Sequence, residues 1–269
     1  MIRVETILCP YRYSGLESGP MADYLAPLKE ADVAAFYRRL AASIQAKFSG
    51  DSLAAILLLH WLDGAGKPKV YPAKYVKDLE EVRSYLKDTA REIFLSRKPA
   101  PNGRIGGIVP RINGTIASTP PGPPYSMHLQ GNVEASVTIQ IKAAAGLNVD
   151  PRELDALYAL HGFQVISDVV ASTAQVGKSQ MYNVTFDKWT CKASDEYHWD
   201  PAKHISVPNP DYKSTAPGAV APGDKDITVY HSNAIRVEKA GLAKAFHDES
   251  EAWDVTDSTI KGPDTVKVS

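Results

Sequence analysis

The chain has 269 residues, of which 30 are Lys or Arg and 31 are Asp or Glu, so its formal net charge is −1. This near-neutral balance, without any dense Lys/Arg run, excludes the broad basic face that general nucleic-acid binding requires. The composition is that of an ordinary soluble globular protein. Two cysteines, Cys9 and Cys191, are too few for a disulfide framework, and the sequence leaves open whether they form one bridge.

Residues 1–98 are predicted to form a helical N-terminal domain. Apolar side chains at three- and four-residue spacing predict an amphipathic helix over residues 28–48. A second helix, with Asp51 or Ser52 as its N-cap and Gly64 after its end, is apolar nearly all round, which places it in a core. Residues 71–98 carry the longest helical pattern, with Pro72 in its first turn.

Residues 99–125 are rich in Pro and Gly and show no periodicity, so they are predicted to form a linker. A connection of this length is usually a linker, a lid or a binding loop.

Residues 126–256 are predicted to form an antiparallel sheet domain with flanking helices, which makes the fold class α+β. Apolar and polar residues alternate over residues 128–142, 163–172 and 180–199, and the last connection is too short for a parallel crossover. A helix starting with Asp150 as its N-cap separates the first two strands. After residue 199 we expect a Pro-rich loop to residue 225, a short strand, a helix capped by Ser232 and a last short strand. Residues 257–269 are predicted to be a flexible tail.

The stretch "SDEYHWDPAKHISVPNPDY", residues 194–212, is the strongest candidate site, because polar groups at the end of a strand are often catalytic. The sequence indicates four candidate catalytic residues: Asp195, His198, Asp200 and His204. They could supply an acid–base pair or ligands for a divalent metal, although the spacing is not a standard zinc pattern. A solvated strand end, with its aromatic residues packed inward, is the alternative interpretation.

Three aromatic residues in the same stretch, Tyr197, Trp199 and Tyr212, are candidate substrate-binding residues that would suit a glycan or a lipid headgroup. Aromatic residues in such loops are equally often packing residues. A site could also gather His128 and His231 from other strand ends. The sequence has no Walker loop, dinucleotide-binding glycine motif, nucleophile elbow or H-E-x-x-H motif, and it assigns no cofactor or metal.

Neither a membrane span nor a signal peptide is predicted. The most hydrophobic run, residues 54–62, is far shorter than the roughly 20 residues that span a bilayer, and residues 1–19 lack a continuous apolar core. The sequence therefore predicts a chain that is cytoplasmic before delivery, or secreted without a cleaved signal peptide.

Four short segments carry a family resemblance: "LLLHWLDGAGKP" in the helical part, "MHLQG" at the start of a strand, then "DEYHWDP" and "EKAGLAKAF". Together they cover about a third of the chain with their surroundings, and they resemble bacterial secreted toxin and effector domains of the type VI secretion cargo or bacteriocin-like kind. The resemblance implies delivery to another bacterium and a target in its envelope. It transfers no catalytic residue.

We therefore expect a secreted antibacterial effector that acts on the bacterial cell envelope, by hydrolysis if it is an enzyme. Its expected partners are an envelope component and an immunity protein. Two alternatives stay open. One is a membrane-permeabilising toxin without an active site, whose helices around residues 54–62 enter a bilayer. The other is a non-catalytic binding or structural module of a secretion apparatus or phage-like particle.

Overall fold

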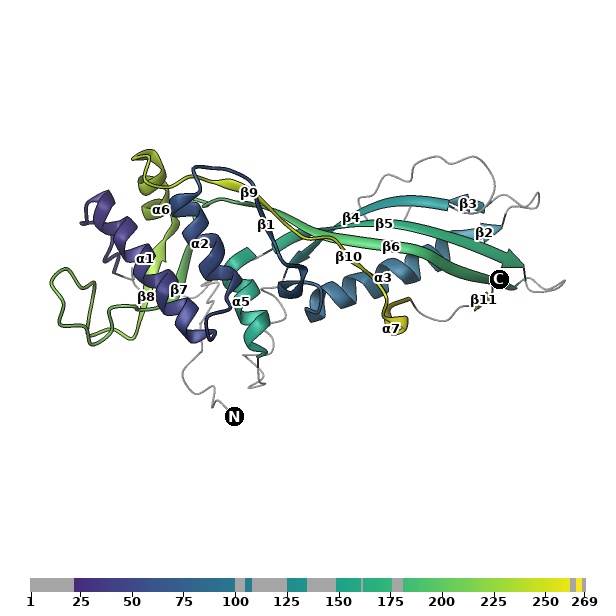
Figure 1. Cartoon of the computed structure of the whole chain (residues 1–269), viewed down its shortest axis with the longest axis horizontal. Coiled ribbons are helices and arrows are strands. Elements are labelled where there is room, and N and C mark those ends of the chain that lie inside the picture. The colour runs from purple at the N-terminus through teal and green to yellow at the C-terminus, as the bar shows by residue number, and fades with distance from the viewer. Residues whose placement is uncertain are drawn as a thin grey trace. The chain divides into compact units, whose positions relative to one another are not determined.

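The computed structural model describes residues 22–99, 105–107, 125–134, 149–160, 162–175, 181–261 and 265–267, and it confirms the α+β class (Figure 1). The chain forms two compact units, each gathered from three separate segments. Unit 1 comprises Met1–Lys69, Ser136–His161 and Glu196–Asp248, and unit 2 comprises Val70–Ala135, Gly162–Asp195 and Glu249–Ser269. This grouping differs from the consecutive division that composition suggests, and most of the predicted linker lies outside the described residues.

Unit 1 is mainly helical, and its core lies between helices that contact one another in pairs. Helix α1 contacts α2 and α6, and α2 contacts α5. The predicted apolar stripe of the first helix is its buried face, with Phe36 and Tyr37 almost fully buried. A two-stranded antiparallel sheet, β7 with β8, completes the unit. The elements are α1 (Glu30–Lys47), α2 (Leu53–Asp63), α5 (Pro151–Leu160), β7 (His204–Pro208), β8 (Asp226–Tyr230) and α6 (His231–Lys239).

The start of α2 is capped from two sides, and the prediction of Ser52 as its N-cap is confirmed. The Ser52 hydroxyl accepts a hydrogen bond from the Ala55 amide at 3.1 Å and donates one to the Asp155 carboxylate at 2.5 Å. Asp155, on α5, also accepts the Leu53 amide at 2.6 Å. Asp155 is 4% exposed, so these hydrogen bonds connect α2 and α5 in the buried interior of unit 1.

In unit 2, the longest predicted helix, over residues 71–98, starts later than predicted. Pro72 has a ψ of 136°, so its backbone is extended and cannot start a helix. The residues before it form β1 (Lys69–Tyr71), and the three after it form a 3-10 turn (Ala73–Tyr75). The α-helix itself, α3 (Glu80–Ser96), therefore starts eight residues after the proline.

The three predicted long strands are confirmed, and they pair antiparallel in the order in which they follow one another. Their register aligns His128, Asp168 and Thr190 across three strands. Residues 135–142 of the first predicted strand lie outside the described residues. The strand order of the sheet is β1-β9-β6-β5-β4, and β10 and β11 also pair with β6. These strands are β4 (Tyr125–Glu134), β5 (Gly162–Gln175), β6 (Met181–Tyr197), β9 (Phe246–Ser250), β10 (Trp253–Asp254) and β11 (Thr265–Lys267).

A bulge interrupts the alternation of β6. Lys188 pairs with Val170 and Phe186 with Ala171, so Asp187 is the extra residue. The rings of Phe186 and Trp189 consequently come within 5.1 Å of each other. The regular alternation predicted over residues 180–199 is therefore broken at this point.

Three further features differ from the sequence-based expectations. The N-cap of α6 is Tyr230, without a side-chain hydrogen bond, so Ser232 is not the cap. The predicted tail contains α7 (Ser258–Lys261) and β11, and Asp257 just before α7 is 2.7 Å from the guanidinium of Arg83. A short hairpin of β2 (Arg97–Pro99) and β3 (Ile105–Gly107) lies where a linker was expected. Among the described helices, none is both long and apolar enough to cross a membrane.

Candidate functional site

The predicted catalytic residues His198 and Asp200 lie in unit 1 and contact different neighbours. The exposed His198 ring has Nδ1 2.7 Å from the backbone oxygen of Glu196. The Asp200 carboxylate accepts the Ala202 amide at 3.0 Å and lies 3.5 Å from the Lys203 ammonium. The Ala202 hydrogen bond and, to a smaller extent, Lys203 lower the pKa of Asp200, so it is ionised at neutral pH.

The histidine beside Asp200 is His231 rather than His198 or His204. The Asp200 amide donates to Nδ1 of His231 at 3.2 Å, and His231 is 7% exposed at the start of α6. His204 opens β7, where its ring lies 5.4 Å from that of Tyr230 on β8. Asp195 belongs to unit 2. Across the residues that the structure describes, no group of three or more His, Cys, Asp or Glu side chains could hold a metal ion.

Tyr197 and Trp199, the predicted substrate-binding aromatics, pack in an aromatic cluster of unit 1. Trp199 lies 5.4 Å from Trp61, and Tyr197 stacks on Phe246 at 5.0 Å, both measured between ring centroids. Burial raises the pKa of Tyr197 far above its ordinary value, so its phenol stays neutral. The members of this aromatic cluster are Tyr37, His60, Trp61, Tyr197, Trp199, His231 and Phe246.

The segments that carry the family resemblance in unit 1 meet in this aromatic cluster. His60, from "LLLHWLDGAGKP", lies 4.6 Å from Phe246, which ends "EKAGLAKAF". The Lys244 amide of the latter segment donates to the Trp61 carbonyl at 2.9 Å. Gly66 adopts a φ of +75°, and a Cβ added there would come within 2.7 Å of the Lys244 side chain. Trp199, from "DEYHWDP", completes the contact through Trp61. The three segments thus form one packed core.

The core also contains one polar anchor. The indole N–H of Trp61 donates to the Glu238 carboxylate of α6 at 2.8 Å, which fixes the ring on that helix. Such a bond satisfies the polar edge of an otherwise fully buried side chain.

Tyr212, the third predicted aromatic, lies in a different setting, on the loop between β7 and β8 that we call the 209–225 loop. The Tyr212 side chain is exposed, and the Lys213 ammonium lies 5.0 Å from its ring centroid. Tyr212 therefore remains available to a partner, unlike Tyr197 and Trp199, whose rings pack in the aromatic cluster.

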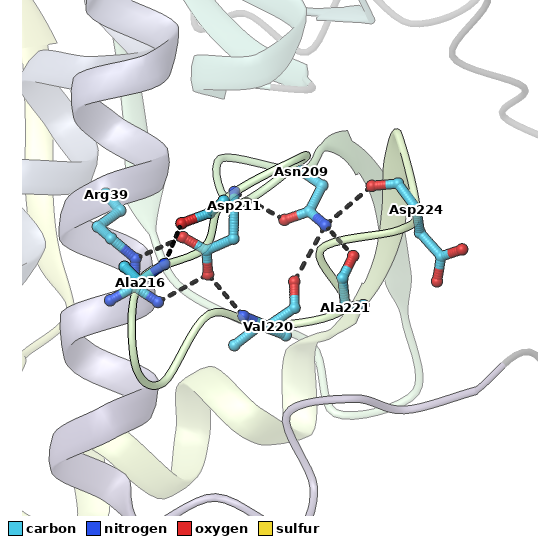
Figure 2. Close-up of polar contacts among 8 residues, drawn as sticks. Arg39, Asn209, Asp211, Ala216, Val220, Ala221 and Asp224 are labelled. Carbon is cyan, nitrogen blue, oxygen red and sulfur yellow. Dashed lines mark hydrogen bonds and ion pairs between the residues drawn. The ribbon is translucent and has the colours of Figure 1, made fainter.

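Asn209 holds this loop from inside (Figure 2). Its buried side-chain amide donates to three backbone carbonyls, those of Val220 at 3.0 Å, Ala221 at 2.7 Å and Asp224 at 2.9 Å. Its side-chain oxygen accepts the Asp211 amide at 2.9 Å. One side chain thus ties the two ends of the loop together and satisfies backbone groups that the irregular chain leaves without ladder partners.

Asp211 supplies the second anchor of the 209–225 loop. It is 3% exposed, and its two carboxylate oxygens accept the Arg39 guanidinium of α1, each at 2.8 Å (Figure 2). One of them also accepts the Val220 amide at 2.8 Å. Burial alone would raise the pKa of Asp211, but Arg39 and the Val220 amide outweigh it, so the pKa lies below its ordinary value.

Asn209 and Asp211 are not among the predicted site residues. The sequence "VPNPDY" carries one signal for them, because Asn and Asp side chains next to Pro often bond nearby backbone in turns. Sequence alone does not tell a buried anchor of this kind from a solvated turn.

A separate polar row crosses the sheet of unit 2. Nδ1 of His128 lies 2.7 Å from the Asp168 carboxylate, and the Thr190 hydroxyl donates to Asp254 at 3.1 Å. His128 and Asp168 are both exposed, so this pair lies on the wet face of the sheet.

The chain matches no protein-family model, no curated protein and no solved structure. Its function is therefore argued from the contacts above.

Proposed function

We propose that the chain is a secreted antibacterial effector that acts on the bacterial cell envelope. The observation that supports this proposal is the convergence of three resembling segments on one core in unit 1, around Trp61, Trp199 and Phe246. Short matches that arise by chance have no reason to pack against each other. A resemblance concentrated in one packed core is what a shared domain would produce.

The contacts favour an effector that acts by recognition over one that hydrolyses a substrate at the predicted residues. Asp200 holds a turn through the Ala202 amide, and the Tyr197 and Trp199 rings pack on other aromatic rings. A catalytic acid or base must reach a proton of the substrate, and a binding aromatic must present a free face. Among the three predicted aromatic residues the exposed one is Tyr212, whose loop is held from inside by Asn209 and Asp211. We therefore infer an envelope component as target and an immunity protein as natural antagonist.

Expression in a bacterium tests the proposal directly. The full chain is produced with and without an added export signal, and growth is followed in both cases. Growth arrest with the export signal only is the expected result. Arrest without export would point to a cytosolic target, and normal growth in both cases would favour the structural or binding module; either result contradicts the envelope proposal.

One variant and one lipid assay separate the modes of action. His198→Ala changes an exposed ring, so the fold is unaffected, and toxicity is expected to persist if recognition is the mechanism. Loss of toxicity in a folded His198→Ala variant would restore the hydrolytic interpretation. Release of dye from liposomes by the purified chain would instead support the membrane-permeabilising alternative.

A further inference from the structure

We propose that the 209–225 loop is a preformed recognition surface for a folded protein of the bacterial envelope. This inference deepens the proposed function and rests on it for the location of the partner. The contacts that form the surface do not depend on it.

The loop is longer than the connection requires. Pro208 at the end of β7 pairs with Asp226 at the start of β8, so the two strand ends are already adjacent. Two to five residues usually suffice to join antiparallel strands at such a point. Loops far above this length in a packed domain are usually functional.

The backbone of the loop is held in one strained shape. Lys213 and Ala221 have φ values of 60° and 43°, in the left-handed region that non-glycine residues seldom adopt. The Lys213 amide donates across the loop to the Pro222 carbonyl at 2.7 Å. Conformations of this kind persist only where surrounding contacts enforce them, and they concentrate at functional sites. Here the buried Asn209 and Asp211 do so.

The exposed side of the loop has the composition of a protein-binding loop. Tyr212 is 41% exposed, and it is followed by small or rigid exposed residues, namely Thr215, Ala216, Pro217 and Gly218. A second exposed aromatic, Tyr24, is hydrogen-bonded to Asp224 of the same loop. Tyrosine with small residues offers contact area at a low cost in side-chain entropy, as in antibody loops. A backbone that is already held in its bound shape lowers the entropic cost of binding further.

The same chemistry disfavours two other occupants. The Lys213 ammonium lies over the Tyr212 ring, so a sugar would have to compete with it for the face on which sugars stack. The loop contains no Leu, Ile, Phe or Trp, and its single Val220 is buried, so it offers nothing to insert into lipid. An aromatic edge, a cation and small residues suit the mixed surface of a folded protein.

Site-specific photo-crosslinking tests the proposal in the exported full chain. A benzoylphenylalanine is placed at the loop as Tyr212→benzoylphenylalanine, and at two matched control positions of unit 1, Leu59 and Leu242. The side chains there are 41%, 38% and 39% exposed, respectively. We expect one protein adduct of defined mass from the loop position, with at least tenfold more product than from either control. No adduct, or equal adducts from all three, would overturn the proposal.

Two further variants link the adduct to the shape of the loop. With the crosslinker at position 217, Tyr212→Ser removes the aromatic contact and should reduce the adduct about tenfold, the range of one interface side chain. Asn209→Ala leaves the exposed face intact but frees three carbonyls, so it should reduce the adduct as well. Retained hydrogen-exchange protection of α1 verifies that the unit is folded. An undiminished adduct in both variants would show that the loop is not the surface.

The outcomes also separate this inference from the proposed function. A loop-specific adduct without growth arrest would keep the recognition surface and reject the effector. Growth arrest without an adduct would keep the effector and reject the recognition surface. Loop-dependent sedimentation of the chain with purified peptidoglycan, without a protein adduct, would replace the protein partner by a glycan and so overturn the inference.

Discussion

Two neighbouring arginines of α1 form the same kind of ion pair in different surroundings, which gives a controlled test of the loop anchor. Arg39 pairs with Asp211, whose side chain is 5% exposed, and Arg38 pairs with Asp63, whose side chain is 57% exposed. Both pairs use two nitrogens and two oxygens. We predict that Asp211→Ala opens the 209–225 loop and that Asp63→Ala has almost no effect.

The magnitude follows from what each substitution leaves behind. Removing Asp211 leaves the buried Val220 amide without its acceptor, which costs about 1–3 kcal/mol. The half-exposed Arg39 adds no more than about 1 kcal/mol, as surface pairs do. Asp211→Ala should therefore destabilise the loop by about 1–4 kcal/mol. The same surface limit of about 1 kcal/mol applies to Asp63→Ala, because neither partner is buried.

Amide hydrogen exchange, read by mass spectrometry on loop peptides, measures this difference locally. It does not assume that the two units unfold together, which a single melting curve would. At about 1.4 kcal/mol per tenfold, Asp211→Ala should speed exchange at Val220 and Lys213 by roughly 5- to 700-fold. Asp63→Ala should change it by no more than about fivefold.

Equal effects of the two substitutions would refute the reasoning, because the argument rests on burial and not on the ion pair. Arg39→Ala supplies the complementary variant. It leaves the buried Asp211 carboxylate with the Val220 amide but without its cation, so the loop should be destabilised more than in Asp63→Ala. Protection of α5, which carries none of the three substituted residues, should be unchanged in all three.

The remaining predictions concern other buried groups. Burial raises the pKa of Asp155, so its contribution to stability is present below its unfolded pKa and is lost as the pH rises through the raised folded value. The pKa of Asp211 is lowered, so its contribution to stability is instead lost as the pH falls through the folded pKa. Both trends are measured as the denaturant midpoint against pH. Asp155→Asn should flatten the first trend, and Asp211→Asn should flatten the second. Burial also raises the pKa of the Cys191 thiol to about 11, so modification by a thiol reagent at neutral pH should be slow until denaturant exposes it. In unit 2, a Cβ at Gly131 would come within 2.2 Å of the Tyr85 ring, so Gly131→Ala should cost about 1–3 kcal/mol, and Tyr85→Ala in the same chain should remove that extra cost in a double-mutant cycle.

Much of the secondary structure could be predicted because it depends on local periodicity. The stripe of residues 28–48 became the buried face of α1, and the Ser52 cap stands where the turn residues place it. The alternation of β5 over residues 162–171 and of β6 over residues 188–194 likewise survives, since each strand buries one face there. These signals lie within a single element, so no knowledge of distant residues is needed to interpret them.

The failures come from residues whose role depends on the third dimension. Pro72 suits the first turn of a helix, but nothing local tells that position from the extended backbone it adopts. The bulge at Asp187 requires knowledge of the partner strand, because an extra residue is defined only against the residue it faces. Strand β7, "HISVP", alternates clearly in burial, but five residues among prolines give too weak a pattern to stand out.

The candidate site shows the same limit most strongly. The histidines and carboxylates of the predicted stretch 194–212 are separated by contacts that no spacing rule contains. Asp200 faces His231, thirty-one residues away, and Asp211 faces Arg39 across 172 residues. The one predicted site residue with an exposed aromatic ring is Tyr212. The two side chains that position its loop read in the sequence as ordinary turn residues.

Buried polar groups favour the 209–225 loop over the exposed histidines as the candidate site. The exposed His198 ring contacts the backbone oxygen of Glu196, two residues away, so placing it costs the fold little. Burying Asp211 removes a charge from water, which a connecting loop does not need and a Gly-containing turn would avoid. A fold that keeps such a group stabilises one loop shape at the expense of simpler alternatives. For the proposed effector, comparing the toxicity of His198→Ala with that of Tyr212→Ser therefore distinguishes hydrolysis of the target from binding to it.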